Sequence, residues 1–270
     1  MQLAGQIAVV TGGAHGIGRA LCRRFAAEGA ASIVVADRNL AAAEQVAAEI
    51  NGVAIECDVS QEASVQSLVN QTLAEYGRID LFASNAGVTV KGGVEVPDPQ
   101  WQWLWDVNLM AHVYAARAVL PSMIERGHGY LLQTSSAAGL LTEIGSAAYA
   151  VTKHAAVGLA EWLAVRYRKQ GIRVSCLCPA GVVTDFLDLD DPVHQFLHMS
   201  AVTPEELMDN VIAGLASEKF LIVSHPEVEE FFQFKSTRYD DFLRNFSKVH
   251  DKIERARNQP SRPPRERDGV

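Results

Sequence analysis

Short apolar runs alternate with longer amphipathic segments over the first two thirds of the chain. Six of the runs predict buried strands because they are rich in Val, Ile, Leu and Ala, at residues 7–10, 33–36, 53–57, 79–83, 130–133 and 172–178. The segments between them have helical spacing or good helix formers and predict helices at residues 18–28, 40–50, 61–76, 101–126 and 149–169. Ser60 is the expected N-cap of the third helix. Strands that alternate with such helices form βαβ units, so the pattern predicts an α/β fold with a parallel sheet and helices on both faces.

The pattern changes in the last third of the chain. Residues 186–199 are rich in Leu, Phe, Asp and His. The sequence TPEE at residues 203–206 predicts the start of a helix, because Thr is a good N-cap, Pro fits the first turn and Glu completes a capping box. Residues 220–223 predict a final strand.

Helical patterns continue after that strand through a C-terminal extension at residues 226–256. Residues 257–270 contain three prolines and several arginines, which predicts a disordered tail. The chain shows no internal repeat and no linker before the tail. Residues 1–256 are therefore expected to form one domain.

Composition and charge narrow the class of protein. Hydrophobic residues at 48% and charged residues at 21% are typical of a globular protein. A net charge of −8 opposes binding to nucleic acid or an anionic membrane surface, and no run reaches the length that spans a bilayer. Met1 to Gln6 do not resemble a signal peptide. The cysteines form no CxxC pair and predict reduced thiols in a cytoplasmic protein: Cys22, Cys57, Cys176 and Cys178.

A glycine-rich segment, TGGAHGIG at residues 11–18, lies between the first strand and the first helix. Glycines at such a turn let the backbone approach a pyrophosphate at the helix N-terminus. Asp37 follows 19 residues after Gly18, at the end of the second strand, where a carboxylate can bind the adenosine ribose and repel a 2′-phosphate. The pattern predicts NAD rather than NADP, although His15 and Arg38 could favour a 2′-phosphate.

Tyr149 and Lys153 form a second motif. Their i, i+4 spacing places a phenol and an ammonium on one helix face. A phenol with a pKa near ~10 is a poor base at neutral pH, and a nearby cation favours its ionised form. The pair by itself is also compatible with an ordinary surface contact. No metal-binding cluster is predicted.

The order and spacing of these motifs resemble the classical short-chain dehydrogenase/reductase family over about residues 5–184. The resemblance implies one doubly wound Rossmann-type domain with a seven-stranded parallel sheet. It also implies that Ser136 binds the substrate oxygen, Tyr149 exchanges a proton, Lys153 binds the nicotinamide ribose and lowers the pKa of Tyr149, and Asn108 positions a water. Ser136 is preferred to Ser135 because the family's serine lies 13 residues before its tyrosine. The cofactor contacts implied beside Tyr149 and Lys153 are Gly12, His15, Gly16, Ile17, Gly18, Asp37, Arg38, Asp58, Val59, Asn85, Ala86, Gly87, Pro179, Val182 and Thr184.

The activity implied by the resemblance is NAD(H)-dependent interconversion of a secondary alcohol and its ketone. Residues 186–218 correspond to the family's substrate lid, and the many large apolar residues at 186–199 predict a hydrophobic substrate unless they pack on the protein body or on a second subunit. Cyclic, aromatic or long-chain alcohols are expected to outperform sugars and hydroxy acids. Phe196→Ala is expected to raise KM about tenfold or more.

Two other functions use related sequences. An NAD-using epimerase or dehydratase employs the same Tyr and Lys, but its longer chain and its TGxxGxxG loop differ from this sequence. A non-enzymatic dinucleotide sensor usually lacks one of these two residues. The final strand also lacks the glycine-rich ending of many tetrameric relatives, so a homodimer through the helices at 101–126 and 149–169 is expected.

Overall fold

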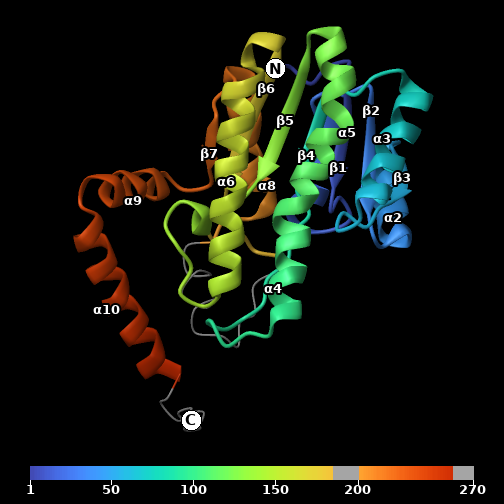
Figure 1. Ribbon diagram of the computed structural model, residues 1–270. Helices are drawn as coiled ribbons and strands as arrows, with labels where there is room; N and C mark the ends of the chain where they lie inside the picture. The colour runs from blue at the N-terminus through green and yellow to red at the C-terminus, as the bar shows by residue number, and fades with distance from the viewer. Residues whose placement is uncertain (185–200, 258–270) are drawn as a thin grey trace, which may run out of the picture.

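Seven parallel strands form one continuous sheet in the computed structural model, which describes residues 1–184 and 201–257. The strands occur in the spatial order β3-β2-β1-β4-β5-β6-β7, so the direction of winding reverses between β1 and β4 (Figure 1). Their bounds are β1 Ile7–Thr11, β2 Ser32–Asp37, β3 Val53–Glu56, β4 Leu81–Ser84, β5 Gly129–Thr134, β6 Ile172–Cys178 and β7 Leu221–Val223. The predicted α/β class and the seven-stranded parallel sheet are confirmed.

Helices cover both faces of this sheet. One layer contains α1 Gly16–Ala27, α2 Leu40–Ile50 and α8 Pro204–Ser217, and the other contains α3 Glu62–Tyr76, α5 Ala111–Arg126 and α6 Ala147–Tyr167. The remaining longer helices are α4 Asp98–Trp105, α9 Pro226–Thr237 and α10 Tyr239–Arg257. None of the helices within residues 1–184 and 201–257 is long and apolar enough to cross a membrane.

The strands are buried on both sides because each face is covered. Val9, Phe82 and Leu131 belong to the core under α3, α5 and α6. The alternate residues Val10 and Leu132 belong to the core under α1, α2 and α8. Side chains alternate across a strand, so a strand in this position needs apolar residues in succession. This is the physical reason why the strands appear as continuous apolar runs in the sequence.

The capping prediction at Thr203 is confirmed, whereas the one at Ser60 is wrong. Thr203 accepts a hydrogen bond from the backbone of Glu206, whose carboxylate in turn accepts from the Thr203 backbone. Helix α3 instead begins at Glu62, with Gln61 as its N-cap. The Ser60 backbone and hydroxyl both donate to the Asp58 carboxylate, 3.0 and 2.8 Å away, so a tight turn at Asp58 uses the group that was expected to cap the helix.

The helix predicted at residues 101–126 begins earlier and is interrupted. Helix α4 begins at Asp98, and one turn of π-helix at Asp106–Met110 joins it to α5. Such π turns are frequent at functional sites. This one contains Asn108, which is fully buried.

Candidate active site

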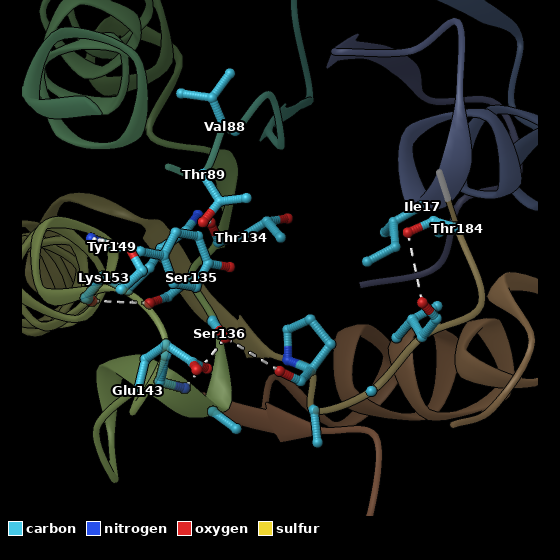
Figure 2. A pocket seen from close by; sticks show the side chains of 18 of the residues that line it. Ile17, Val88, Thr89, Thr134, Ser135, Ser136, Glu143, Tyr149, Lys153 and Thr184 are labelled. Carbon is cyan, nitrogen blue, oxygen red and sulfur yellow. Dashed lines mark hydrogen bonds between the residues drawn. The ribbon is translucent and has the colours of Figure 1, made fainter. Parts of the chain in front are cut away.

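A cavity of about 890 Å³ lies at the carboxyl ends of the strands, next to the point where the strand order reverses. Ligands bind at this place in open α/β sheets. Of the predicted site residues, Gly18 and Asn108 are buried and do not line the cavity. All the others line it, from Gly12 in the glycine turn to Thr184 after β6. Figure 2 shows Tyr149 and Ser136 on one side of the cavity and Ile17 and Thr184 on the other.

The glycine turn after β1 is packed so closely that side chains are excluded at two positions. Gly12 has a φ of +64°, and a Cβ there would lie 2.9 Å from the Cα of Ala86. A Cβ on Gly18 would lie 1.9 Å from the carbonyl oxygen of Gly12. Thr11 holds the turn against the end of β4, because its Oγ1 accepts hydrogen bonds from the backbone N–H groups of Asn85 and Ala86 at 3.0 and 3.3 Å.

The turn leads directly into the N-terminus of α1. His15 is the N-cap, but its side chain makes no capping hydrogen bond. Gly16 and Ile17, the first residues of this 12-residue helix, line the cavity. Backbone N–H groups without a side-chain cap, together with the helix dipole, favour a phosphate group. The glycine turn and the start of α1 therefore form a cradle that fits the pyrophosphate of a dinucleotide.

Asp37 lies at the end of β2, on the wall of the same cavity. One carboxylate oxygen accepts from the Ala14 backbone N–H at 3.1 Å, and the other accepts from the Asn39 N–H at 3.0 Å. These bonds fix the carboxylate beside the glycine turn, and each oxygen retains a lone pair for a ligand hydroxyl. Arg38 and His15 lie exposed at the same end of the cavity.

Tyr149 and Lys153 lie one turn apart near the start of α6. Ser146 caps this helix, and its hydroxyl accepts from the Tyr149 backbone N–H at 3.2 Å. The Lys153 Nζ donates to the Thr134 carbonyl oxygen at 3.2 Å and lies 5.6 Å from the centre of the Tyr149 ring. Lys153 is almost fully buried, whereas Tyr149 is partly exposed to the cavity.

The two serines after β5 have different environments. The Ser135 hydroxyl is buried and donates to the Lys153 carbonyl oxygen at 2.8 Å, which ties the loop to α6. The Ser136 hydroxyl lies nearer the cavity surface, where it accepts from the Ala138 backbone N–H at 3.1 Å and contacts the Pro179 carbonyl oxygen at 3.4 Å. Ser136 therefore has the more accessible hydroxyl.

Asn108 joins the π turn to the other elements of the site. Its Oδ1 accepts from the Val88 N–H at 2.8 Å, and its Nδ2 donates to the Val88 carbonyl at 2.9 Å and to the Thr152 hydroxyl at 3.2 Å. Gly87 lies between Asn108 and Lys153, since a Cβ on Gly87 would lie 3.4 Å from the Asn108 Oδ1 and 3.3 Å from the Lys153 Nζ. The side chain of Asn108 thus fixes both α6 and the end of β4.

Burial controls the ionisation of the central pair. Burial raises the pKa of Tyr149, and this effect outweighs the hydrogen bond with Ser136, while the nearby Glu143 charge raises the pKa further. Burial also lowers the pKa of Lys153 to about 8. The expected lowering of the Tyr149 pKa by Lys153 is therefore absent in the protein alone, because desolvation of the phenol is the larger effect.

Several residues of the cavity wall were not predicted. Glu143 comes from the loop before α6, and its carboxylate accepts from the Gly145 N–H at 2.9 Å. No local motif marks such a loop residue. Aromatic residues of α9 and α10 also line the cavity, and here the helical spacing in the extension was an available signal. The predicted lid residues at 186–199, Phe196 among them, lie outside the described residues.

The sheet order and the glycine turn at the reversal point define a Rossmann-type α/β protein. A family model described as "short chain dehydrogenase" matches residues 6–192, more than half of the chain. The chain belongs to this short-chain dehydrogenase family of oxidoreductases, as the sequence motifs predicted.

Individual relatives cover most of the chain. A 1-deoxy-11-beta-hydroxypentalenate dehydrogenase from Streptomyces exfoliatus is 34% identical over 263 residues, which cover 92% of each chain. A 3beta-hydroxysteroid dehydrogenase 2 from Eggerthella lenta is 37% identical and covers 68% of this chain and 73% of its own. Among solved structures, a short-chain dehydrogenase/reductase from Burkholderia phymatum in complex with NAD has a TM-score of 0.80 and 25% identity, with 97% and 99% of the two chains covered.

Proposed function

We propose that the protein is an NAD(H)-dependent oxidoreductase that interconverts a hydrophobic secondary alcohol and its ketone, with Tyr149 as the acid and base. The observation that carries this proposal is that one cavity contains both a cradle for a dinucleotide and the Ser136, Tyr149 and Lys153 side chains. A nicotinamide dinucleotide, when bound, supplies the centre that accepts or donates the hydride. The protein supplies binding, orientation and proton transfer.

Ser136 and Tyr149 serve the substrate oxygen in this proposal. The accessible Ser136 hydroxyl hydrogen-bonds that oxygen and fixes its position next to the phenol. Tyr149 takes the hydroxyl proton during oxidation and returns it during reduction. Because burial raises its pKa, Tyr149 is ready as an acid for ketone reduction at neutral pH, and alcohol oxidation is expected to accelerate as the pH rises.

Lys153 and Asn108 organise these two groups. The Lys153 ammonium donates to Thr134, and its remaining N–H groups can bind a ribose hydroxyl beside Tyr149. Its charge also favours ionisation of the phenol during oxidation. Asn108 fixes α6 relative to the end of β4 through its hydrogen bonds to Thr152 and Val88. The proposed water beside Asn108 would connect Lys153 with solvent.

Asp37 supports NAD over NADP, since its fixed carboxylate would accept bonds from the ribose hydroxyls and repel a 2′-phosphate. The presence of NAD in the Burkholderia phymatum relative is compatible with this choice. Asp58 and Val59 flank the proposed adenine site, and Asn85, Ala86, Pro179, Val182 and Thr184 complete the walls around the dinucleotide.

Asp37→Ala is expected to lower the ratio of kcat/KM for NAD over NADP by about tenfold or more, because the repulsion of the 2′-phosphate is lost and Arg38 can then bind it. Steady-state kinetics with each dinucleotide measure this ratio. Glu56→Ala is a matched control, since Glu56 pairs with Asp37 in the sheet register but lies outside the cavity wall. A wild-type enzyme that prefers NADP would contradict the assignment.

The proposed substrate is a small molecule with an apolar body. The cavity wall includes Val107, Leu141 and Ile144, together with four phenylalanines of α9 and α10: Phe231, Phe234, Phe242 and Phe246. The test is the absorbance of reduced nicotinamide formed from a panel of secondary alcohols, sugars and hydroxy acids at fixed NAD concentration. Hydrophobic alcohols are expected to give the highest kcat/KM, and a panel in which polyols are the best substrates would contradict the proposed substrate class.

A homodimer through α5 and α6 is also proposed. Three apolar side chains of α6 are exposed: Val151 at 48%, Trp162 at 56% and Val165 at 84%. Apolar groups gathered on a helix face favour association. Val165→Glu is expected to convert the dimer to a monomer in light scattering, and a Val94→Glu control, at an equally exposed loop position, should remain dimeric. A wild-type monomer at micromolar concentration would contradict this proposal.

A further inference from the structure

Helices α9 and α10, residues 226–257, form a C-terminal arm beside the sheet. Figure 1 shows α9 leaving the end of β7 and α10 turning away from the layer that contains α6. The arm is held together by aromatic contacts: the Phe242 ring lies 6.3 Å from Phe234 and 4.5 Å from Phe246, measured between ring centres. Phe242 is buried within this cluster, whereas Phe246 is only partly covered.

The apolar residues of α10 follow a single stripe. Phe242, Phe246, Val249 and Ile253 recur at intervals of four, three and four residues, which places them on one face of the helix. All four line the cavity that also contains Ser136 and Tyr149. The neighbouring Leu243 is 49% exposed and does not line the cavity. The stripe therefore faces the active-site cavity, and its apolar surface continues the wall formed by Phe231 and Phe234 of α9.

The buried Lys235 connects the arm to the segment after β5, which contains Ser136, and to α6. The Lys235 Nζ donates to the carbonyl oxygens of Leu140 and Leu141 at 2.7 and 3.0 Å, and it lies 3.3 Å from the Nε2 of His154. Leu140 directly follows η2, the short helix Ala137–Gly139 that Ser136 caps. His154 directly follows Lys153 on α6. Lys235 thus fixes the arm to both segments that contain the proposed catalytic residues.

We propose that the C-terminal arm is the binding wall for the part of the substrate remote from its carbinol carbon. This inference rests on the proposed function and adds a substrate class to it: secondary alcohols and ketones with a long or polycyclic hydrocarbon body. The polar end of such a molecule lies at Ser136 and Tyr149, and its apolar body lies against the stripe of α10. Phe246 and Val249 are the specificity-determining residues, because they belong to the stripe and are less buried than Phe242.

The relatives leave the size of the substrate open. Their names include a hydroxysteroid dehydrogenase and a meso-2,3-butanediol dehydrogenase, so alcohols of very different size occur among proteins similar to this chain. A four-carbon alcohol bound at Ser136 and Tyr149 is too short to use the phenylalanines of the arm as well. The apolar wall therefore favours a larger substrate. Each additional apolar group that enters such a wall should increase kcat/KM, because burial of apolar surface stabilises the bound state.

The experiment measures kcat/KM for the 2-alkanol series from 2-butanol to 2-decanol with the full-length enzyme and NAD. The wild type is expected to prefer 2-decanol to 2-butanol by about a hundredfold or more, and Phe246→Ala is expected to reduce this ratio about tenfold. Val249→Trp, which fills the wall, should reduce the ratio as well. Leu243→Ala is the matched control, at an exposed position of α10 outside the stripe and the cavity wall, and should preserve the ratio. Thermal unfolding and NADH binding show that each variant is folded.

The outcomes distinguish a failure of the arm from a failure of the proposed function. Suppose that the wild type oxidises the series, but that Phe246→Ala and Val249→Trp each change the 2-decanol to 2-butanol ratio of kcat/KM less than threefold. This result refutes the arm as a substrate wall and leaves the proposed function standing. The arm is refuted in the same way if Leu243→Ala lowers the ratio as much as Phe246→Ala. A wild type that binds NADH but oxidises none of the alcohols refutes the proposed function and the inference that rests on it.

Discussion

Replacement of Tyr149 by phenylalanine is expected to lower kcat for secondary alcohols by a factor of ~10²–10³, the contribution of a positioned acid–base group. The substitution removes one oxygen and keeps the ring. Affinity for NADH is expected to remain within about threefold, because the glycine turn, Asp37 and Lys153 remain in place. Steady-state kinetics and NADH fluorescence titration measure the two quantities separately.

Tyr167→Phe is the matched control for this variant. Tyr167 ends the same helix, but its ring packs beside Trp162 and lies outside the cavity. The control should keep the wild-type kcat. A Tyr149→Phe enzyme with more than about a third of the wild-type kcat would show that another group transfers the proton.

Replacement of Lys153 by methionine is expected to damage turnover and cofactor affinity together. We expect kcat to fall by ~10²-fold and the Kd for NADH to rise about tenfold, because one ammonium both supports the phenol and binds the ribose. Tyr149→Phe affects only turnover, so the two variants give different patterns. Normal NADH affinity in Lys153→Met would contradict the proposed binding of the nicotinamide ribose by Lys153.

The same substitution is expected to stabilise the protein without cofactor. Burial lowers the folded-state pKa of Lys153 to about 8, below its unfolded value, so the ammonium opposes folding at neutral pH. Lys153→Met removes this cost and also the hydrogen bond to Thr134, with a net gain of roughly 2 kcal/mol in the free energy of unfolding.

The size of this stabilisation by Lys153→Met depends on pH. The cost is fully present below pH about 8 and disappears as the pH rises through the unfolded pKa, because above that value the wild-type lysine is neutral in both states. Urea denaturation at neutral and alkaline pH measures the difference, with the exposed Lys248→Met as control. A Lys153→Met protein less stable than the wild type at neutral pH would show that the ammonium supports the fold.

The sheet and the glycine turn could both be predicted from the sequence because close packing restricts the residues that fit there. Strands covered on both faces must be apolar at successive positions, and a turn as close as that between Gly12 and Gly18 must lack Cβ atoms. Both requirements produce local sequence patterns, a continuous apolar run and a glycine-rich segment. The cap at Ser60 failed because a competing acceptor two residues earlier, Asp58, holds its hydroxyl.

The rest of the site depends on contacts between distant segments. Nothing in the sequence distinguishes Lys235 from the other lysines on helices, and only the fold brings it to Leu140, Leu141 and His154. The raised pKa of Tyr149 likewise depends on burial, whereas the i, i+4 spacing to Lys153 suggested a lowered one. Spacing reports which groups share a helix face, but the solvent exposure of a side chain is decided by everything packed around it.

Deuterium transfer is the decisive measurement of hydride chemistry in this protein. Wild-type enzyme is incubated with NAD and 2-octanol deuterated at the carbinol carbon, and the nicotinamide product is analysed by mass spectrometry. We expect one deuterium in each reduced nicotinamide and one molecule of 2-octanone for each deuterium transferred, with formation of both products reduced by ~10²–10³ in Tyr149→Phe. Ketone formed without deuterium in the nicotinamide, or equal transfer in Tyr149→Phe, would contradict hydride transfer with Tyr149 as the acid and base.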